Sequence, residues 1–364
     1  MTDQFKVKRQ GNIELLRILS MILIICWHFG CHGISIVDFD FTAIGCFHWV
    51  VRSIANNAVN IYVLISAYFL CTIKFKTKKL VSLAVEVWFY SVLIYFMLLL
   101  SGGLSFSVKD AFTSFFPIIS GQYWFVSSYV LLYILSPFLN KTIETLDKKL
   151  HLTLVGILLV SFSVIPTFLF FVPWINWGSS CGIVWMIVLY FVGSYLRKYM
   201  DIARLKKNRL MYITIILCLM PFFSKVFIAY ISRVLTGGVV GSSIFYMNNS
   251  VLIVASSISI FLFFLTINIS NENVNRVIQF IAPSTFAVYL IHDNPFLYQK
   301  MWRYFVGHMH LTDYRCIYEF FGVILIIFLS CVFIDLFRRL LFFSLNNTSV
   351  IFNVTGRLKN IKLD

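Results

Sequence analysis

Residues 13–33 read IELLRILSMILIICWHFGCHG, and this stretch decides the class of the protein. An α-helix needs about 20 predominantly apolar residues to cross the hydrocarbon core of a bilayer, and this run has that length. Glu14 and Arg17 interrupt it near the start, and His28 and His32 near the end. Because ionisable groups are costly inside a membrane, they usually face a cavity or a partner. We therefore predict a membrane-spanning helix that carries functional side chains.

The rest of the chain has the composition of an integral membrane protein. Of its 364 residues, 60% are hydrophobic and 12% are charged, and the mean hydropathy is +0.86. A soluble domain of this length needs far more charge to cover its surface. The composition therefore predicts contact with membrane lipids over most of the chain.

Apolar runs of membrane-spanning length recur along the whole sequence. They lie near residues 13–33, 49–72, 80–101, 122–139, 152–173, 179–196, 210–231, 250–268, 277–297 and 317–337. The stretch 104–120 is shorter and contains charged residues and a proline, so we expect a surface or re-entrant segment there. The predicted fold class is an all-α integral membrane protein with about ten transmembrane helices. One membrane domain would occupy residues 1–345, and a short cytoplasmic tail residues 346–364.

Basic residues give the predicted helices a direction. The net charge of +15 comes from Lys and Arg in short clusters between the apolar runs, which is typical of orientation signals and not of nucleic-acid binding. With a cytoplasmic N-terminus, 22 of the 30 Lys and Arg residues fall on the cytoplasmic side and six in outer loops. This asymmetry predicts that both termini are cytoplasmic.

Polar side chains of four predicted spans converge in the outer half of the membrane. They are His28 in the first span, Asn60 in the second, Tyr123 and Trp124 in the fourth, and His292 and Asp293 in the ninth. We therefore predict a polar pocket that opens toward the outer face.

One face of the first span also connects this pocket with the cytoplasmic side. Arg17 and His28 are eleven residues apart, close to three helical turns, so they share a face and lie roughly 16 Å apart along the axis. A cytosolic anion with a long reactive arm, such as acyl-CoA, would match this layout. Lys76 and Lys79 at the inner end of the second span would add contacts to its phosphates.

Each of these residues also has a purely structural interpretation. A lone histidine in a membrane helix often hydrogen-bonds to a neighbouring helix, and lysines between two spans often serve only as orientation signals. His28 and His32 have the i,i+4 spacing of metal ligands, but no acid accompanies them in a His-Glu-x-x-His motif. We therefore predict neither a bound metal ion nor a bound cofactor.

Four blocks of sequence carry a family resemblance. They are residues 12–17 with 27–28, 57–69, 123–140 and 289–295. In this order they resemble the membrane-bound acyltransferase 3 family of bacterial O-acyltransferases, whose first-helix signature is an arginine followed eleven residues later by a histidine. Ala67 stands where glycine is common in that family, and Lys76 and Lys79 occupy the place of an Arg-x-x-Arg pair.

The resemblance implies transfer of an acyl group, most often acetyl, from acyl-CoA to a hydroxyl group. The acceptor would be a cell-envelope glycan such as a capsule, or its lipid-linked precursor, at the bacterial cytoplasmic (inner) membrane. A transporter or flippase for lipid-linked sugars, or a glycan polymerase, is the alternative. We see no internal repeats or broken helices in matched positions, and no large basic outer loops, that would favour either.

Transfer from a thioester to an alcohol needs a base for the hydroxyl proton and donors for the oxyanion. We assign the base to His28, with His292 as a second base or acceptor ligand and Asp293 as a group that orients an imidazole. The residues expected to hold the CoA phosphates are Arg17, Lys76 and Lys79, and those expected to bind substrate are Asn60, Tyr123 and Trp124. Direct transfer and an acyl-histidine relay both fit the sequence.

Overall fold

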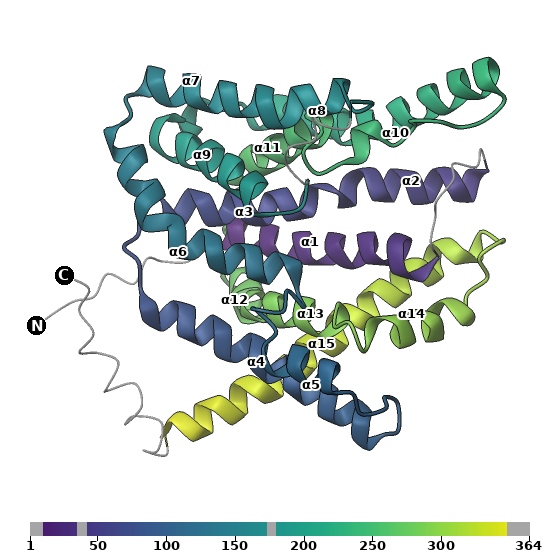
Figure 1. Cartoon of the computed structure of the whole chain (residues 1–364). Helices are drawn as coiled ribbons and strands as arrows, with labels where there is room; N and C mark the ends of the chain where they lie inside the picture. The colour runs from purple at the N-terminus through teal and green to yellow at the C-terminus, as the bar shows by residue number, and fades with distance from the viewer. Residues whose placement is uncertain (1–9, 35–41, 173–179, 348–364) are drawn as a thin grey trace, which may run out of the picture.

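The computed structural model describes residues 10–34, 42–172 and 180–347, and within these ranges helices are the only regular secondary structure. The long helices form a bundle in which α1 lies near the centre (Figure 1). The helices are α1 (Gly11–His28), α2 (Ala43–Ala55), α3 (Asn57–Leu70), α4 (Thr77–Leu100), α5 (Val108–Phe115), α6 (Trp124–Thr145), α7 (Lys148–Leu159), α8 (Ile165–Phe168), α9 (Ile183–Tyr199), α10 (Lys207–Thr236), α11 (Val251–Leu265), α12 (Glu272–Ile281), α13 (Thr285–His292), α14 (Tyr298–Gly307) and α15 (Arg315–Asn347).

The predicted all-α membrane fold is confirmed. In the described part of the chain, eight helical segments are long and apolar enough to cross a bilayer. The predicted spans at 122–139 and 179–196 are also helical, as α6 and α9, but fall short of that measure. The 17-residue α9 is mostly buried and packs against α3, α6 and α7. α9 falls short already by its length.

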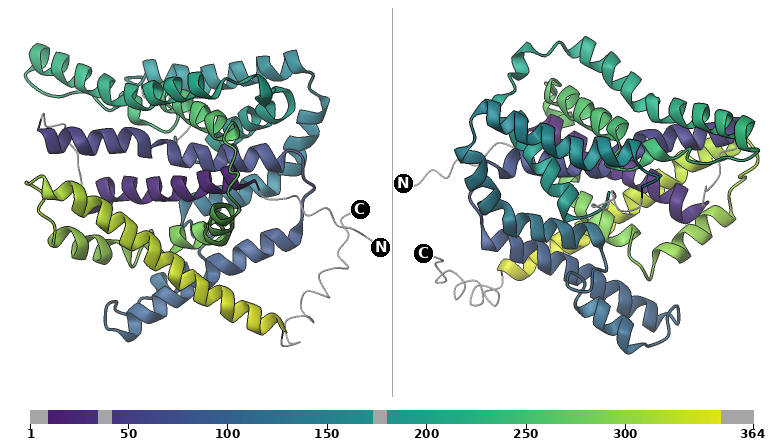
Figure 2. Two further views of the ribbon diagram at one scale, coloured as in Figure 1. Left: turned by 180° about the vertical axis from the view of Figure 1, so that it is seen from behind. Right: turned by 45° about the horizontal axis from the view of Figure 1, so that its top comes forward.

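The first helix, α1, begins at the same side of the bundle at which the last helix, α15, ends. In Figure 1, α1 begins and α15 ends on the left, where the connection between α3 and α4 also lies; the reverse view in Figure 2 agrees. We call this side the lysine end, after Lys74 and Lys76 in that connection and Lys78 and Lys79 in the first turn of α4, and we call the opposite side the far end. That the lysine end is cytoplasmic stays a prediction from the charge count. Apart from its first two residues, the predicted tail 346–364 lies outside the described residues.

The central helix α1 changes its winding just after His28. It packs against α2, α3, α12, α13 and α15. A π-helical turn, Phe29–Gly33, continues it, and the Ile34 amide donates to the Phe29 carbonyl at 3.1 Å. Such π-helical turns are rare and often occur at functional sites. This one carries His32.

A seam of hydrogen bonds joins α3, α9 and α11. The Asn60 side-chain amide donates to the Asn248 carbonyl at 2.7 Å and accepts from the Trp185 indole at 2.9 Å. Nearby, the Ser257 hydroxyl donates to the Asn57 side-chain oxygen at 2.8 Å. Hydrogen bonds of this kind hold helices together in lipid, where no water competes. Asn60 therefore has a structural role as polar contact between helices.

Helices α3 and α9 approach each other very closely at Gly193. A Cβ atom added there would lie 2.6 Å from the Cβ of Ala67 and 3.2 Å from the Leu64 carbonyl oxygen. Only glycine allows this approach, because small residues let helix backbones come near one another in membranes. The alanine at position 67 thus faces a glycine across the interface.

We expect Gly193→Ala to destabilise this contact, because overpacking costs roughly 1–3 kcal/mol. The measurement is thermal unfolding of the purified protein in detergent. Gly156→Ala in α7 is the matched control, since a Cβ added there meets nothing within 4 Å. Equal losses of stability in the two variants would contradict the close approach.

Candidate active site

A cavity of about 760 Å³ runs beside α1 between the lysine end and the far half of the bundle. This volume is typical of ligand-binding pockets. Its walls come from α1, α3, α4, α6 and α13. Lining side chains toward the lysine end include Glu14, Arg17, Lys76, Lys78, Lys79 and Glu86, and those toward the far end include Trp27, His28, Asn56, Trp124 and Asn248.

Arg17 presents a cation with spare hydrogen-bonding capacity to the cavity. Its Nε lies 4.0 Å from a Glu14 carboxylate oxygen, and within the described part of the chain this buried nitrogen makes no hydrogen bond. The Tyr62 hydroxyl fixes the backbone below it by donating to the Arg17 carbonyl at 2.9 Å. Glu86 is engaged elsewhere, in an ion pair with Arg338 at 3.0 Å. The lysine end of the cavity therefore has an excess of positive charge suited to an anion.

His28 lies at the end of a short chain of hydrogen bonds. It is buried and lines the cavity, whereas His292 is fully buried behind it. Their rings meet through His28 Nδ1 and His292 Nε2, which are 2.9 Å apart. On its other side, His292 Nδ1 lies 2.6 Å from the Val288 carbonyl oxygen one turn back in α13.

This chain fixes which nitrogen of each ring carries the proton. A carbonyl oxygen only accepts, so His292 Nδ1 must carry a hydrogen. In the neutral ring, His292 Nε2 is then an acceptor, and His28 Nδ1 must donate to it. The neutral His28 ring therefore keeps a free lone pair on Nε2. The packing of α13 against α1 thus leaves His28 Nε2 able to accept a proton.

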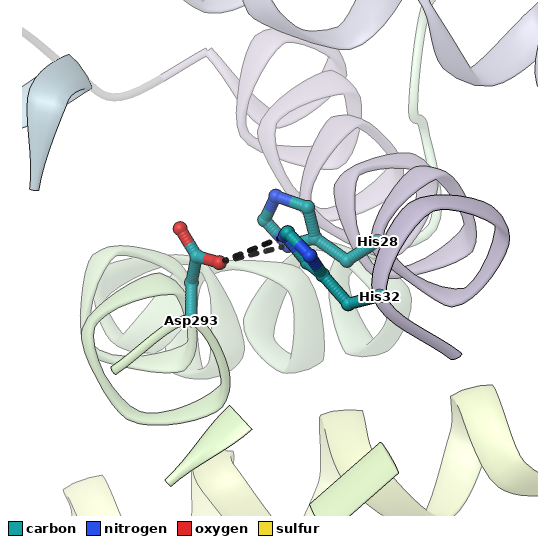
Figure 3. Close-up of side chains that lie close together, drawn as sticks. All are labelled: His28, His32 and Asp293. Atoms are coloured by element: carbon teal, nitrogen blue, oxygen red, sulfur yellow. Dashed lines mark ion pairs between the residues drawn. The ribbon is translucent and has the colours of Figure 1, made fainter. Parts of the chain in front are cut away.

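Two further groups surround His28 at the far end of the cavity. Asp293 Oδ1 lies 3.6 Å from His28 Nδ1 and 3.8 Å from His32 Nε2, so the carboxylate points between the two rings (Figure 3). Asp293 follows α13, whereas His28 ends α1 and His32 lies on the π-helical turn that follows it. A carboxylate at this distance would stabilise an imidazolium formed at His28.

Tyr123 holds the end of α13 in place. Its hydroxyl donates to the Leu290 carbonyl at 3.0 Å and accepts from the Asn294 side-chain amide at 2.7 Å. The Asn294 side-chain oxygen accepts in turn from the Phe296 amide at 3.0 Å. These bonds fix the backbone on both sides of His292.

The residues proposed from the sequence fall into two groups. Those that line the cavity are His28, Arg17, Lys76, Lys79 and Trp124, and those that lie behind its wall are His292, Asp293, Asn60 and Tyr123. Tyr62, Tyr129 and Asn56 also line the cavity, although none of them was among the site residues predicted from the sequence. Whether these side chains face the cavity depends on how α3 and α6 are rotated about their axes. In mostly apolar helices the sequence pattern does not reveal this rotation.

The family model of an acyltransferase domain, that of the acyltransferase 3 family, matches residues 10–338. Comparisons with curated proteins and with solved structures found no match. The family match covers nearly all of the described chain, including every residue of the cavity wall. The chain therefore belongs to the acyltransferase 3 family and is a multi-pass membrane acyltransferase.

Proposed function

We propose that this protein transfers an acyl group, in the first place acetyl, from acyl-CoA to a hydroxyl group of a cell-envelope glycan or its lipid-linked precursor. It would act in the bacterial cytoplasmic membrane, with the lysine end in the cytoplasm. The observation that carries the proposal is that one cavity has Arg17 toward one end and His28, with its Nε2 lone pair, toward the other. A donor with a phosphorylated head and a long thioester arm would span the distance between these two residues.

The donor would enter from the lysine end. Its phosphates would meet Arg17 and, at the mouth, Lys76 and Lys79, while the pantetheine arm extends along α1. The two residues are eleven positions apart on one helix, so the thioester would reach His28 roughly 16 Å further in. The acceptor would approach from the far end, beside Trp27 and Trp124.

The transfer step would use His28 Nε2 as the general base. As the acceptor oxygen bonds to the thioester carbonyl carbon, Nε2 takes the hydroxyl proton. The imidazolium is stabilised by Asp293, 3.6 Å from Nδ1. When the tetrahedral intermediate collapses, the carbon–sulfur bond breaks and the CoA thiolate receives the proton from Nε2. The Trp124 indole, a hydrogen-bond donor in the cavity wall, is our candidate for stabilising the oxyanion.

Arg17→Ala should chiefly raise the KM for acyl-CoA, by about tenfold or more, with a smaller effect on kcat. A charge-assisted hydrogen bond to a phosphate contributes roughly 1.5–3 kcal/mol, and its loss weakens donor binding. The measurement is initial rates against acyl-CoA concentration for the purified enzyme. Lys141→Ala is the control, because Lys141 is an exposed base paired with Glu144 at 3.6 Å outside the cavity. An unchanged KM in Arg17→Ala would show a structural role for Arg17 instead.

The proposed acceptor class is tested in cells of the source organism. Envelope glycans are compared between cells with and without the gene, and we expect loss of an ester-linked acetyl group on deletion. Complementation with wild type should restore the ester, and complementation with His28→Ala should not. A flippase or a polymerase would be favoured by a different result: the deletion strain makes much less of the glycan, and the glycan that remains carries as much acetyl per repeat unit as in wild type.

A further inference from the structure

The three groups around the far end of the cavity also have the chemistry and spacing of a metal site. One nitrogen each from His28 and His32 and one carboxylate oxygen of Asp293 lie within 4.8 Å of one another. Figure 3 shows the carboxylate directed between the two rings. We propose that these residues bind a divalent ion of the zinc class, and that the bound ion arrests acyl transfer.

The distances are close to those of a tetrahedral zinc site. With Zn–N and Zn–O bonds of about 2.0–2.2 Å, neighbouring ligand atoms lie roughly 3.3 Å apart. Asp293 Oδ1 lies 3.6 Å from His28 Nδ1 and 3.8 Å from His32 Nε2. The third separation, between the two histidine nitrogens, is at most 4.8 Å, so side-chain shifts of about 1.5 Å or less would bring all three ligands to the tetrahedral spacing. Two imidazoles and one carboxylate form a donor set that zinc uses in proteins, with a fourth position left for water.

The backbone supports this arrangement from two separate elements. His28 ends the regular part of α1, and His32 lies on the π-helical turn that follows, so the local winding sets the angle between the rings. Asp293 is held by the α13 end that Tyr123 clamps. His32 and Asp293 are only partly buried, which gives an ion a route from the far end.

Metal binding at this site would place the His28 ring proton on the nitrogen that catalysis needs free. In the metal-free site, His28 Nδ1 carries the proton and donates it to His292, which leaves the lone pair on Nε2. An ion bound to Nδ1 displaces that hydrogen bond and requires the ring proton to reside on Nε2. No net proton is lost from the ring, but the base is removed. Inhibition therefore rests on the proposed function, whereas metal binding itself does not.

The binding test uses the purified full-length protein in detergent, freed of any metal-affinity tag, with Co²⁺ as the spectroscopic probe. We expect the visible absorption of tetrahedral Co²⁺ to saturate at one ion per chain, and Zn²⁺ to displace it, because zinc binds such sites more tightly than cobalt. His32→Gln and Asp293→Asn should each weaken Co²⁺ binding by more than about tenfold.

His310→Gln is the matched control. His310 forms an exposed pair with Glu319 at 2.6 Å, so it offers a histidine and an acid without the third ligand. Its substitution should leave the Co²⁺ spectrum unchanged. The metal site is overturned if wild type gives no tetrahedral spectrum, or if His32→Gln and Asp293→Asn bind Co²⁺ as wild type does.

Inhibition is measured separately, as acyl transfer in zinc-buffered solution. We expect free Zn²⁺ to inhibit wild type reversibly, with activity restored by a chelator, and the inhibitory concentration to rise more than about tenfold in His32→Gln. Zinc-insensitive transfer by a protein that binds Co²⁺ would overturn the inhibitory role alone. Binding of Co²⁺ by a protein without acyltransferase activity would refute the proposed function and leave the metal site standing.

Discussion

His28→Ala is expected to reduce acyl transfer by about a thousandfold or more, while the protein remains folded in the membrane. A positioned general base contributes roughly 10²–10⁴ to the rate, and no described neighbour of His28 lines the cavity with a comparable free imidazole lone pair. The measurement is transfer of labelled acetyl from acetyl-CoA by the purified enzyme.

Folding of this variant is checked by membrane yield and gel filtration in detergent. His308→Ala is the control, since His308 is an exposed residue at the end of α14, away from the cavity. Transfer by His28→Ala at more than about a tenth of the wild-type rate would remove His28 from the mechanism.

The second large loss of activity is expected on substitution of His292, because His292 determines which nitrogen of His28 carries the proton. His292→Met removes the acceptor for His28 Nδ1–H, so the neutral His28 ring no longer has a fixed lone pair on Nε2. We expect kcat to fall about a hundredfold, with a smaller change in KM, within the range for general-base catalysis. The measurement is kcat and KM for acyl-CoA in wild type and variant.

His292→Gln separates this role from simple packing. Its side-chain oxygen can accept from His28 Nδ1–H, and its amide can donate to the Val288 carbonyl, as the histidine does. We therefore expect the glutamine variant to retain at least about ten times the kcat of the methionine variant. Equal rates in the two variants would mean that His292 acts only by filling space.

The sequence predicted those features that depend on local pattern. The helices at all ten predicted ranges follow from apolar length, which is a local property. The shared face of Arg17 and His28 follows from helical periodicity, and both residues line the cavity. The depth of His292 also followed from its place in a span, which is why the two histidines were expected in the same half of the bundle.

Contacts between distant helices could not be predicted in this way. The 2.9 Å bond between His28 and His292 joins residues 264 positions apart, and it depends on the rotation of α13 against α1. Asn60 illustrates the same point, because its amide bonds to Trp185 of α9 and Ser257 of α11, and the residue does not line the cavity. Asp293 was expected to orient an imidazole, but its position between His28 and His32 depends on the same rotation of α13 against α1.

The most direct test uses purified protein in lipid nanodiscs. It asks whether an acyl group passes from a donor at the lysine end to an acceptor at His28. Carbon-14 acetyl-CoA is supplied together with envelope glycans extracted from cells that lack the gene. We predict that wild type releases CoA and places an equal amount of alkali-labile label in the glycan fraction, and that His28→Ala does neither. Intact acetyl-CoA after incubation with folded wild-type protein and acceptor would contradict acyl transfer through this cavity.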